Sequence, residues 1–246
     1  MHLGVRISLD LQLMHHKTTV LRIANILGNN DLAREHLNKC IYSVGLGSND
    51  YLNNYFMPFF YQTSSQYTPE QYAEALIQQY SRQVMNLYNY GARKVAFIGL
   101  GQIGCVPNQI ALYGTNDSTC VENINSAVQL FNSKLVSLVG GLNRNLTDAK
   151  FIYVNIYDMS SSDPSSYDFK ELNTGCCGIG RNKGELTCLP FEVPCSNRSE
   201  YIFWDAYHPT EAANVIAAGR AYIVQNLSDA HPIDIHRLAQ LNLTDI

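Results

Sequence analysis

The chain has 246 residues, a length that suits one large domain or two small ones. Hydrophobic residues make up 46% of it, enough for a substantial core, whereas charged residues make up only 15%. The net charge of −4 and the lack of a Lys/Arg cluster argue against a nucleic-acid partner. Because no apolar stretch reaches the roughly 18–20 residues needed to cross a bilayer, we expect no transmembrane segment.

The first half of the chain alternates helix-like and strand-like segments. Residues 8–27 contain both a short alternation typical of a strand and a longer helical spacing, and we favour a helix there. The run 40–46 is short, apolar and β-branched, which predicts a buried strand. Thr68-Pro-Glu-Gln71 is a capping box with Pro at the first helical position, and apolar residues at helical spacing then continue toward Gly91.

The second half continues the alternation. Residues 94–99 and 150–156 are predicted strands, and the helix between them is expected to end at Gly140-Gly141. A loop rich in Cys, Gly and Asn is expected over about 160–199, followed by a helix over 210–226. Short buried strands that alternate with helices predict an α/β fold with a parallel sheet. With no internal repeat or linker, one domain over 1–246 is the economical interpretation.

Asp205 and His208 are the leading catalytic candidates. They stand three residues apart in Trp-Asp-Ala-Tyr-His-Pro, after an apolar run and before a predicted helix. In a serine-hydrolase triad the carboxylate orients the imidazole, whose second nitrogen then deprotonates a serine. Taken alone, this spacing is more often a surface Asp and a helix-capping His.

Gly47-Ser-Asn-Asp50 follows the first predicted strand, at the edge where open α/β sheets bind ligands. The Asn49 side chain could donate to a developing oxyanion there, with Gly47 shaping the turn. The alternative is an ordinary strand-to-helix turn, since all four residue types suit turns.

Gly99, Gly101 and Gly104 match the spacing of a dinucleotide-binding loop after a strand. No long amphipathic helix opens directly after them, because Cys105-Val-Pro107 and a turn-like segment follow. We therefore interpret the glycines as a loop beside the site and expect no cofactor.

Seven cysteines and five N-glycosylation sequons indicate the secretory route. The cysteines lack the paired Cys-x-x-Cys spacing of zinc sites, so we predict disulfides of undetermined connectivity, with Cys40 free and no metal. The sequons begin at Asn116, Asn145, Asn197, Asn226 and Asn242. Residues 1–10, however, lack the charged and apolar regions of a signal peptide.

Taken together, the segments are more specific than any one alone. The chain resembles the plant GDSL esterase/lipase family of the SGNH hydrolases over essentially its whole length. The resemblance rests on 41–55 (IYSVGLGSNDYLNNY), 91–107 (GARKVAFIGLGQIGCVP), the cysteine segments CCGIGRN and CLPFEVPC, and 203–214 (FWDAYHPTEAAN).

The resemblance implies a flavodoxin-like, three-layer α/β/α fold with strand order 2-1-3-4-5. Residues 40–46, 94–99 and 150–156 would then be strands 3, 4 and 5. It also implies ester hydrolysis by a Ser-His-Asp triad with Asp205 and His208, an oxyanion hole that includes Asn49, and a secreted protein. The substrate would be an ester or lipid-like small molecule.

The family's nucleophilic serine lies in a Gly-Asp-Ser block near the start of the catalytic domain, and we find no such block. The closest imitation, Asn116-Asp-Ser118, lies in a turn-rich sequon. We therefore expect an N-terminally truncated domain, with strand 1, and strand 2 beside it, ahead of residue 1. Such a chain would have an exposed strand edge and little hydrolytic activity. The alternatives are a non-catalytic binding protein and, less favoured, a dinucleotide oxidoreductase.

Overall fold

A computed structural model of the protein describes residues 6–115, 119–161 and 167–242. They fall into two compact units, which are described separately. The first comprises Met1–Ile98, Phe131–Val154 and His231–Ile246, and the second Gly99–Leu130 and Asn155–Ala230. A single domain over the whole chain stays a prediction.

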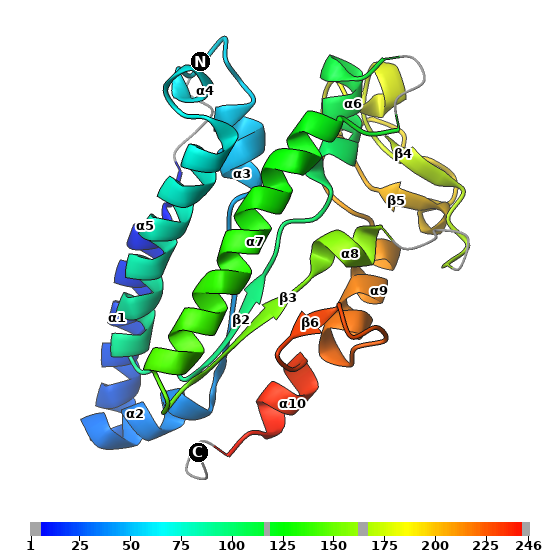
Figure 1. The fold of residues 1–246 in the computed structure, drawn as a ribbon. Coiled ribbons are helices and arrows are strands. Elements are labelled where there is room, and N and C mark those ends of the chain that lie inside the picture. Colours follow the sequence, from blue (N-terminus) through cyan, green and yellow to red (C-terminus); the bar gives the residue numbers. More distant parts are fainter. Residues whose placement is uncertain (1–5, 116–118, 162–166, 243–246) are drawn as a thin grey trace. The chain divides into compact units, whose positions relative to one another are not determined.

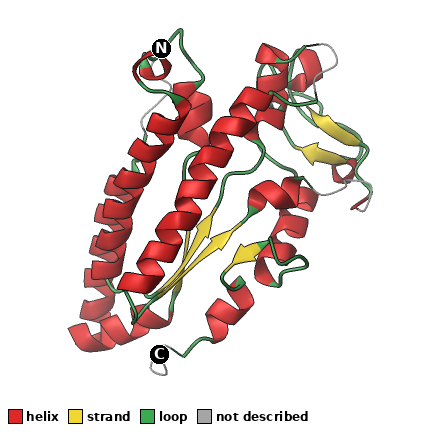
Figure 2. Cartoon of the chain, viewed as in Figure 1, coloured by secondary structure: helices red, strands yellow, loops and turns green. Residues whose placement is uncertain are grey.

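Three parallel strands form the centre of the first unit (Figures 1 and 2). They are β1 (Ile41–Gly45), β2 (Lys94–Ile98) and β3 (Lys150–Val154). Val95 faces Tyr42 on one side and Phe151 on the other, and the full sheet order is β1-β2-β3-β6, with β6 at Ala230–His231. All three predicted strands and the parallel α/β class are confirmed.

β1 differs from its two neighbours in burial. β2 and β3 are almost wholly buried, whereas every second residue of β1 is exposed. In the described part of the chain, β1 hydrogen-bonds to β2 alone and lies at the edge of the sheet. The apolar run alone predicted a buried strand, which was wrong, whereas the exposed strand edge that was also expected is present in the described residues.

The predicted helices of the first unit form with their expected caps. Thr68 and Gln71 make the reciprocal capping box at the start of α5 (Pro69–Asn89). α1 (Leu9–Leu27) matches the predicted 8–27, whereas α2 (Asn30–Lys39) was not predicted. The remaining elements of this unit are α3 (Ser48–Asp50), a π-helical turn (Tyr51–Tyr55), α4 (Thr63–Gln66) and α10 (Ile235–Gln240).

α7 (Glu122–Asn145) runs through Gly140-Gly141, where the sequence predicted its end. Its apolar stripe continues beyond the glycines, since Val139 and Leu142 are both buried. The Asn143 side chain also bonds the N–H and C=O of Phe151 in β3. Burial of the stripe outweighs the cost of a helical glycine, about 0.5–1 kcal/mol each relative to alanine.

The second unit is built around a small sheet of β4 (Glu171–Gly175) and β5 (Tyr201–Phe203). β4 lies inside the predicted 160–199 loop, where its polar sequence gave no strand signal. The helices are α6 (Pro107–Tyr113), α8 (Ile156–Ser160) and α9 (Glu211–Tyr222). α9 ends at Tyr222, four residues before the helix end predicted at Asn226.

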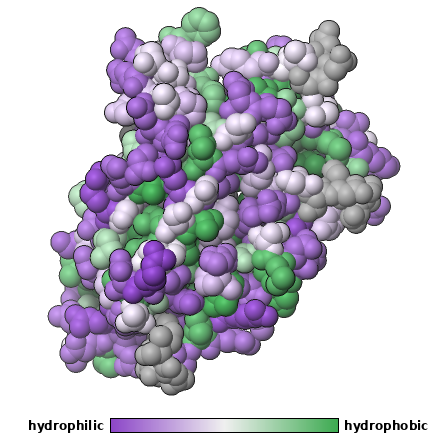
Figure 3. Space-filling model, viewed as in Figure 1, coloured by the Kyte–Doolittle hydropathy of each residue, from purple (hydrophilic) through white to green (hydrophobic). Residues whose placement is uncertain are grey.

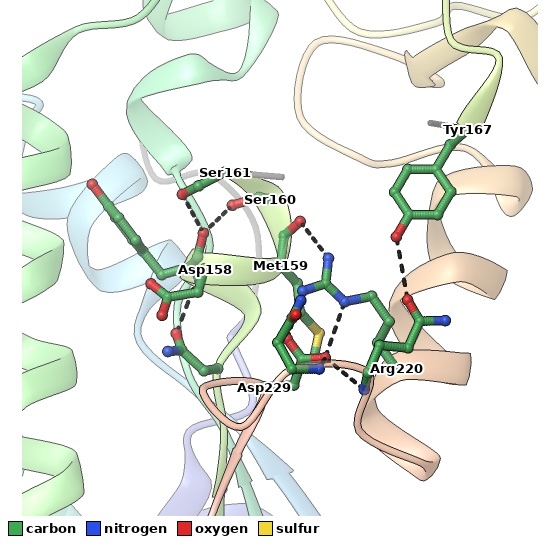
Figure 4. Close-up of polar contacts among 11 residues, drawn as sticks. Asp158, Met159, Ser160, Ser161, Tyr167, Arg220 and Asp229 are labelled. Carbon is green, nitrogen blue, oxygen red and sulfur yellow. Dashed lines mark hydrogen bonds and ion pairs between the residues drawn. The ribbon is translucent and has the colours of Figure 1, made fainter. Parts of the chain in front are cut away.

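A buried ion pair explains where α9 stops. Arg220 contacts Asp229 at 2.5 Å, and their side chains are 2% and 0% exposed. Figure 4 shows Arg220 reaching from α9 to this carboxylate and to the carbonyl of Met159 in α8. Asp229 also accepts from the N–H groups of Gln225 and Asn226, so the chain turns there instead of continuing the helix.

Three disulfides hold the second unit: Cys105–Cys120, Cys176–Cys195 and Cys177–Cys188. Cys40 is free. The predictions of disulfides and of a free Cys40 are therefore confirmed, and the connectivity that the sequence left open is now defined.

The surface is mixed in polarity. The face in Figure 3 is mainly hydrophilic, with hydrophobic residues scattered between the polar ones. Among the described residues, no helix has both the length and the apolar character required to span a bilayer.

Candidate active site

A tight turn after β5 presents Asp205 and His208. The N–H of Trp204 donates to the carbonyl of His208 at 2.8 Å, and the N–H of Thr210 donates to Ile202 at 2.8 Å. Thr210 then caps α9, because its hydroxyl accepts from the N–H of Ala213. The turn is thus closed at its base and continues directly into a helix, which fixes the three-residue spacing in space.

The two side chains form a close pair. His208 Nδ1 lies 3.0 Å from both carboxylate oxygens of Asp205. The Asp205 side chain is 8% exposed, whereas that of His208 is 74% exposed. A carboxylate at Nδ1 favours the tautomer that leaves Nε2 unprotonated and able to accept a proton. The structure therefore brings together the two residues predicted as acid and base.

Several donors surround the Asp205 carboxylate. The N–H groups of Tyr207 and His208 each donate to Oδ1 at 2.8 Å, and the Thr187 hydroxyl donates to Oδ2 at 2.6 Å. Burial alone would raise the pKa of Asp205. The hydrogen bonds from Thr187, from the two backbone N–H groups and from the imidazole outweigh burial and lower the pKa. Asp205 is therefore ionised at neutral pH.

Thr187 is the residue of this site that the sequence did not predict. It lies 18 positions before Asp205, in the cysteine-rich segment. No periodicity or spacing links the two residues, and only the neighbouring Cys188 could have drawn attention to this position.

Gly47 and Asn49 belong to the first unit. Gly47 has φ +125°, a conformation that L side chains rarely adopt, so the turn after β1 requires a glycine here. Asn49 follows in α3, its side chain is exposed, and its Oδ1 accepts from Asn53 Nδ2 at 2.8 Å. This bond leaves the Asn49 amide N–H groups available as donors. Its role in an oxyanion hole stays a prediction.

Gly104 in the 99–104 loop has a packing role. A Cβ on Gly104 would lie 2.4 Å from the carbonyl oxygen of Val121 and 2.7 Å from Asn125 Oδ1. A 3₁₀ turn, Ile103–Cys105, and the short α6 follow the loop. These contacts account for the glycine at position 104 without a dinucleotide, in line with the interpretation of this segment as a loop.

Metal ligands do not gather in the part of the chain that the structure describes: it contains no group of three or more His, Cys, Asp or Glu suited to a metal ion. Six of the seven cysteines are bonded to one another.

Comparison with known proteins identifies the family. A profile of GDSL-like lipases/acylhydrolases matches residues 6–221. The chain belongs to the GDSL-like lipase/acylhydrolase family. Among its GDSL relatives in Arabidopsis thaliana, GDSL esterase/lipase At1g29670 is 58% identical over 97% of this chain. GDSL esterase/lipases At1g29660 and At4g18970 are 55% and 53% identical over the same share of the chain.

The match covers only part of these GDSL relatives. The chain spans 66% of the length of the first two and 67% of the third. The family match and the identities confirm the resemblance deduced from the sequence blocks.

Proposed function

We propose that the chain carries the acid–base part of a carboxylic-ester hydrolase site. The observation that carries this proposal is the Asp205–His208 pair, a buried, hydrogen-bonded carboxylate against the Nδ1 of an exposed imidazole. Membership of a family of lipases and acylhydrolases supports ester bonds as the target. The substrate would be an ester or lipid-like small molecule.

The chemistry follows from the two side chains. His208 Nε2 would take the proton of a serine hydroxyl as that oxygen attacks the ester carbonyl, and Asp205 would stabilise the resulting imidazolium. His208 would then return the proton to the leaving alcohol, which leaves an acyl-serine for water to hydrolyse. The Asn49 amide would donate to the oxyanion.

The nucleophile is the missing part. In the family the serine lies in a Gly-Asp-Ser block, and no Gly-Asp-Ser occurs in this sequence. Among the described residues of the second unit, no hydrogen bond reaches His208 Nε2. The chain by itself should therefore hydrolyse esters poorly, since loss of a triad serine costs about 10⁶-fold in rate.

The lack of that block also favours one alternative, a non-catalytic protein that keeps the fold and binds ester-like ligands. The two proposals differ in what happens when a Gly-Asp-Ser block is supplied. A hydrolase site would regain acyl transfer, whereas a degenerate site would not.

Labelling with a serine-directed fluorophosphonate tests the proposal. We expect no stoichiometric labelling of the chain alone. Joined to a segment that carries the family's Gly-Asp-Ser block, the chain should be labelled at one serine, and His208→Ala should slow this labelling. The exposed helix residue His15 provides a matched control, His15→Ala. Stoichiometric labelling of the chain alone, abolished by replacing one of its own serines, would overturn the assignment of a missing nucleophile.

We also propose that the protein passes through the secretory route. The three disulfides fit an oxidising compartment. Of the sequon residues, Asn145, Asn197 and Asn226 are exposed, while the Asn116 sequon and the rest of the Asn242 sequon lie outside the described residues. Expression through a plant secretory pathway should give a mass that falls on enzymatic deglycosylation, and an unchanged mass would contradict glycosylation.

A further inference from the structure

Thr187 is exposed, yet its hydroxyl donates a hydrogen bond to the buried carboxylate of Asp205. The hydroxyl oxygen lies 2.6 Å from Asp205 Oδ2, and the Asp205 side chain is 8% exposed. Water could satisfy an exposed hydroxyl at little cost. The buried carboxylate oxygen has fewer alternatives, so the main consequence of the bond falls on Asp205.

The bond also constrains how the carboxylate is turned. Oδ1 accepts two backbone N–H groups, from Tyr207 and His208. Oδ2 accepts no backbone N–H among the described residues, and its donors are Thr187 and the His208 ring. Without the Thr187 hydroxyl, the imidazole would be the one described donor left on that oxygen.

The segment that bears Thr187 is tied to the same turn as Asp205. Cys188, the next residue, forms a disulfide with Cys177. The N–H of Cys177 donates to the carbonyl of Trp204 at 2.8 Å, one residue before Asp205. On the other side of Thr187, Leu186 forms an antiparallel bridge with Ile179. Covalent and backbone bonds thus hold the hydroxyl against the carboxylate.

We propose that Thr187 is a positioning residue for the Asp205–His208 pair and that the Cys177–Cys188 disulfide holds it in place. The inference rests on the proposed function, because it assigns Thr187 to the same acid–base pair. The hydroxyl fixes the rotation of the carboxylate and keeps it ionised, so that Nδ1–H of His208 stays directed at it. Among the described residues, the titratable groups beside Asp205 are His208 and the Tyr207 phenol.

NMR titration of the chain itself tests the role of the hydroxyl. Protein labelled with ¹³C at aspartate carboxyls and ¹⁵N at histidine rings reports the Asp205 midpoint and the His208 tautomer, with Asp205→Asn and His208→Gln assigning the signals. Thr187→Val should raise the Asp205 midpoint and lower the fraction of the Nδ1–H tautomer. Thr187→Ser should restore both, and the control Thr18→Val, which removes an exposed hydroxyl within α1, should change neither.

The disulfide has its own variant, Cys177→Ala with Cys188→Ala. If the disulfide holds Thr187 in place, the titration midpoint of Asp205 should rise in this double variant as it does in Thr187→Val. An unchanged midpoint in Thr187→Val, or a midpoint that Thr187→Ser fails to restore, would overturn the proposal even if the double variant does not fold. The NMR readout needs no ester hydrolysis. A negative result for Thr187 can therefore be distinguished from a negative result in the fluorophosphonate test of the proposed function.

Discussion

The Asp205 carboxylate combines burial with a low pKa. Burial acts to raise the pKa, but Thr187, two backbone N–H groups and the His208 ring all donate to the two oxygens, and together they lower it. A carboxylate whose pKa is lower in the folded chain than in the unfolded one stabilises the fold at pH values above its ordinary pKa. That contribution is lost as the pH falls through the folded-state pKa.

Asp205→Asn should therefore destabilise the fold at neutral pH and much less in acid. An amide cannot accept from all these donors, so we expect a loss of about 1–3 kcal/mol in the free energy of unfolding at pH 7. The difference should begin to shrink below the ordinary Asp value of 3.8 and should continue to shrink as the pH falls through the lowered pKa of Asp205 in the folded chain. Urea unfolding at pH 7 and at roughly pH 2.5 measures it. A difference that is equal at both pH values would contradict this account, and exposed Asp31→Asn is the control.

Among the residues of the site, the sequence predicted only the contact between residues that are close in sequence. Asp205 and His208 are three positions apart, so a single turn can pair them. Thr187 reaches the same carboxylate only through a disulfide and a β-bridge. Such a contact depends on the connectivity of the cysteines, which the spacing alone could not define.

At the scale of elements, α7 carries two glycines that its backbone does not need. Neither has a positive φ, and a Cβ on Gly141 would meet nothing closer than Arg144 Nη2 at 4.0 Å. Gly141→Ala should therefore stabilise the chain by about 0.5–1 kcal/mol, because alanine loses less backbone freedom on folding.

Thermal or urea unfolding measures this gain. Gly91→Ala is the contrasting variant, since Gly91 has φ +107° and its Cβ would lie 3.4 Å from Leu37 Cβ. It should destabilise the chain. A destabilising Gly141→Ala would show that α7 needs the glycine for packing.

The elements also show which signals in the sequence were sufficient. The capping box at Thr68 and the apolar runs of the three strands predicted their elements, because local bonds and burial act together there. Gly140-Gly141 wrongly predicted the end of α7, because burial of the helix's apolar stripe in the core outweighs the low helix propensity of glycine. β4 was missed because Glu171-Leu-Asn-Thr-Gly175 has little β-propensity and is stabilised by pairing with β5.

At the scale of the whole chain, the open edge of β1 combines several features that cost stability. A cavity of about 350 Å³ borders β1, α1 and α5. Around it His16 Nε2, Tyr42 OH and Gln83 Oε1 are buried without a hydrogen-bond partner among the described residues. Unsatisfied groups of this kind cost about 1–3 kcal/mol each, and an exposed strand edge promotes association.

The chain should therefore self-associate as its concentration rises. Ser43→Lys places a charge on the exposed positions of β1 and should reduce association. Ser133→Lys, on an exposed face of α7, should have no such effect. Light scattering after size exclusion measures the mass, and a monodisperse wild-type monomer at all concentrations would contradict the prediction.

We propose that Asp205 and His208 form the acid–base pair of an ester hydrolase. The direct test of this pair is kcat/KM for a soluble p-nitrophenyl ester, measured on the chain joined to a segment that carries the family's Gly-Asp-Ser block. We predict that His208→Ala lowers kcat/KM by about 10⁴-fold or more, as removal of a triad histidine does elsewhere. His15→Ala should leave it unchanged. Hydrolysis by the joined protein that survives His208→Ala would show that His208 is not the catalytic base.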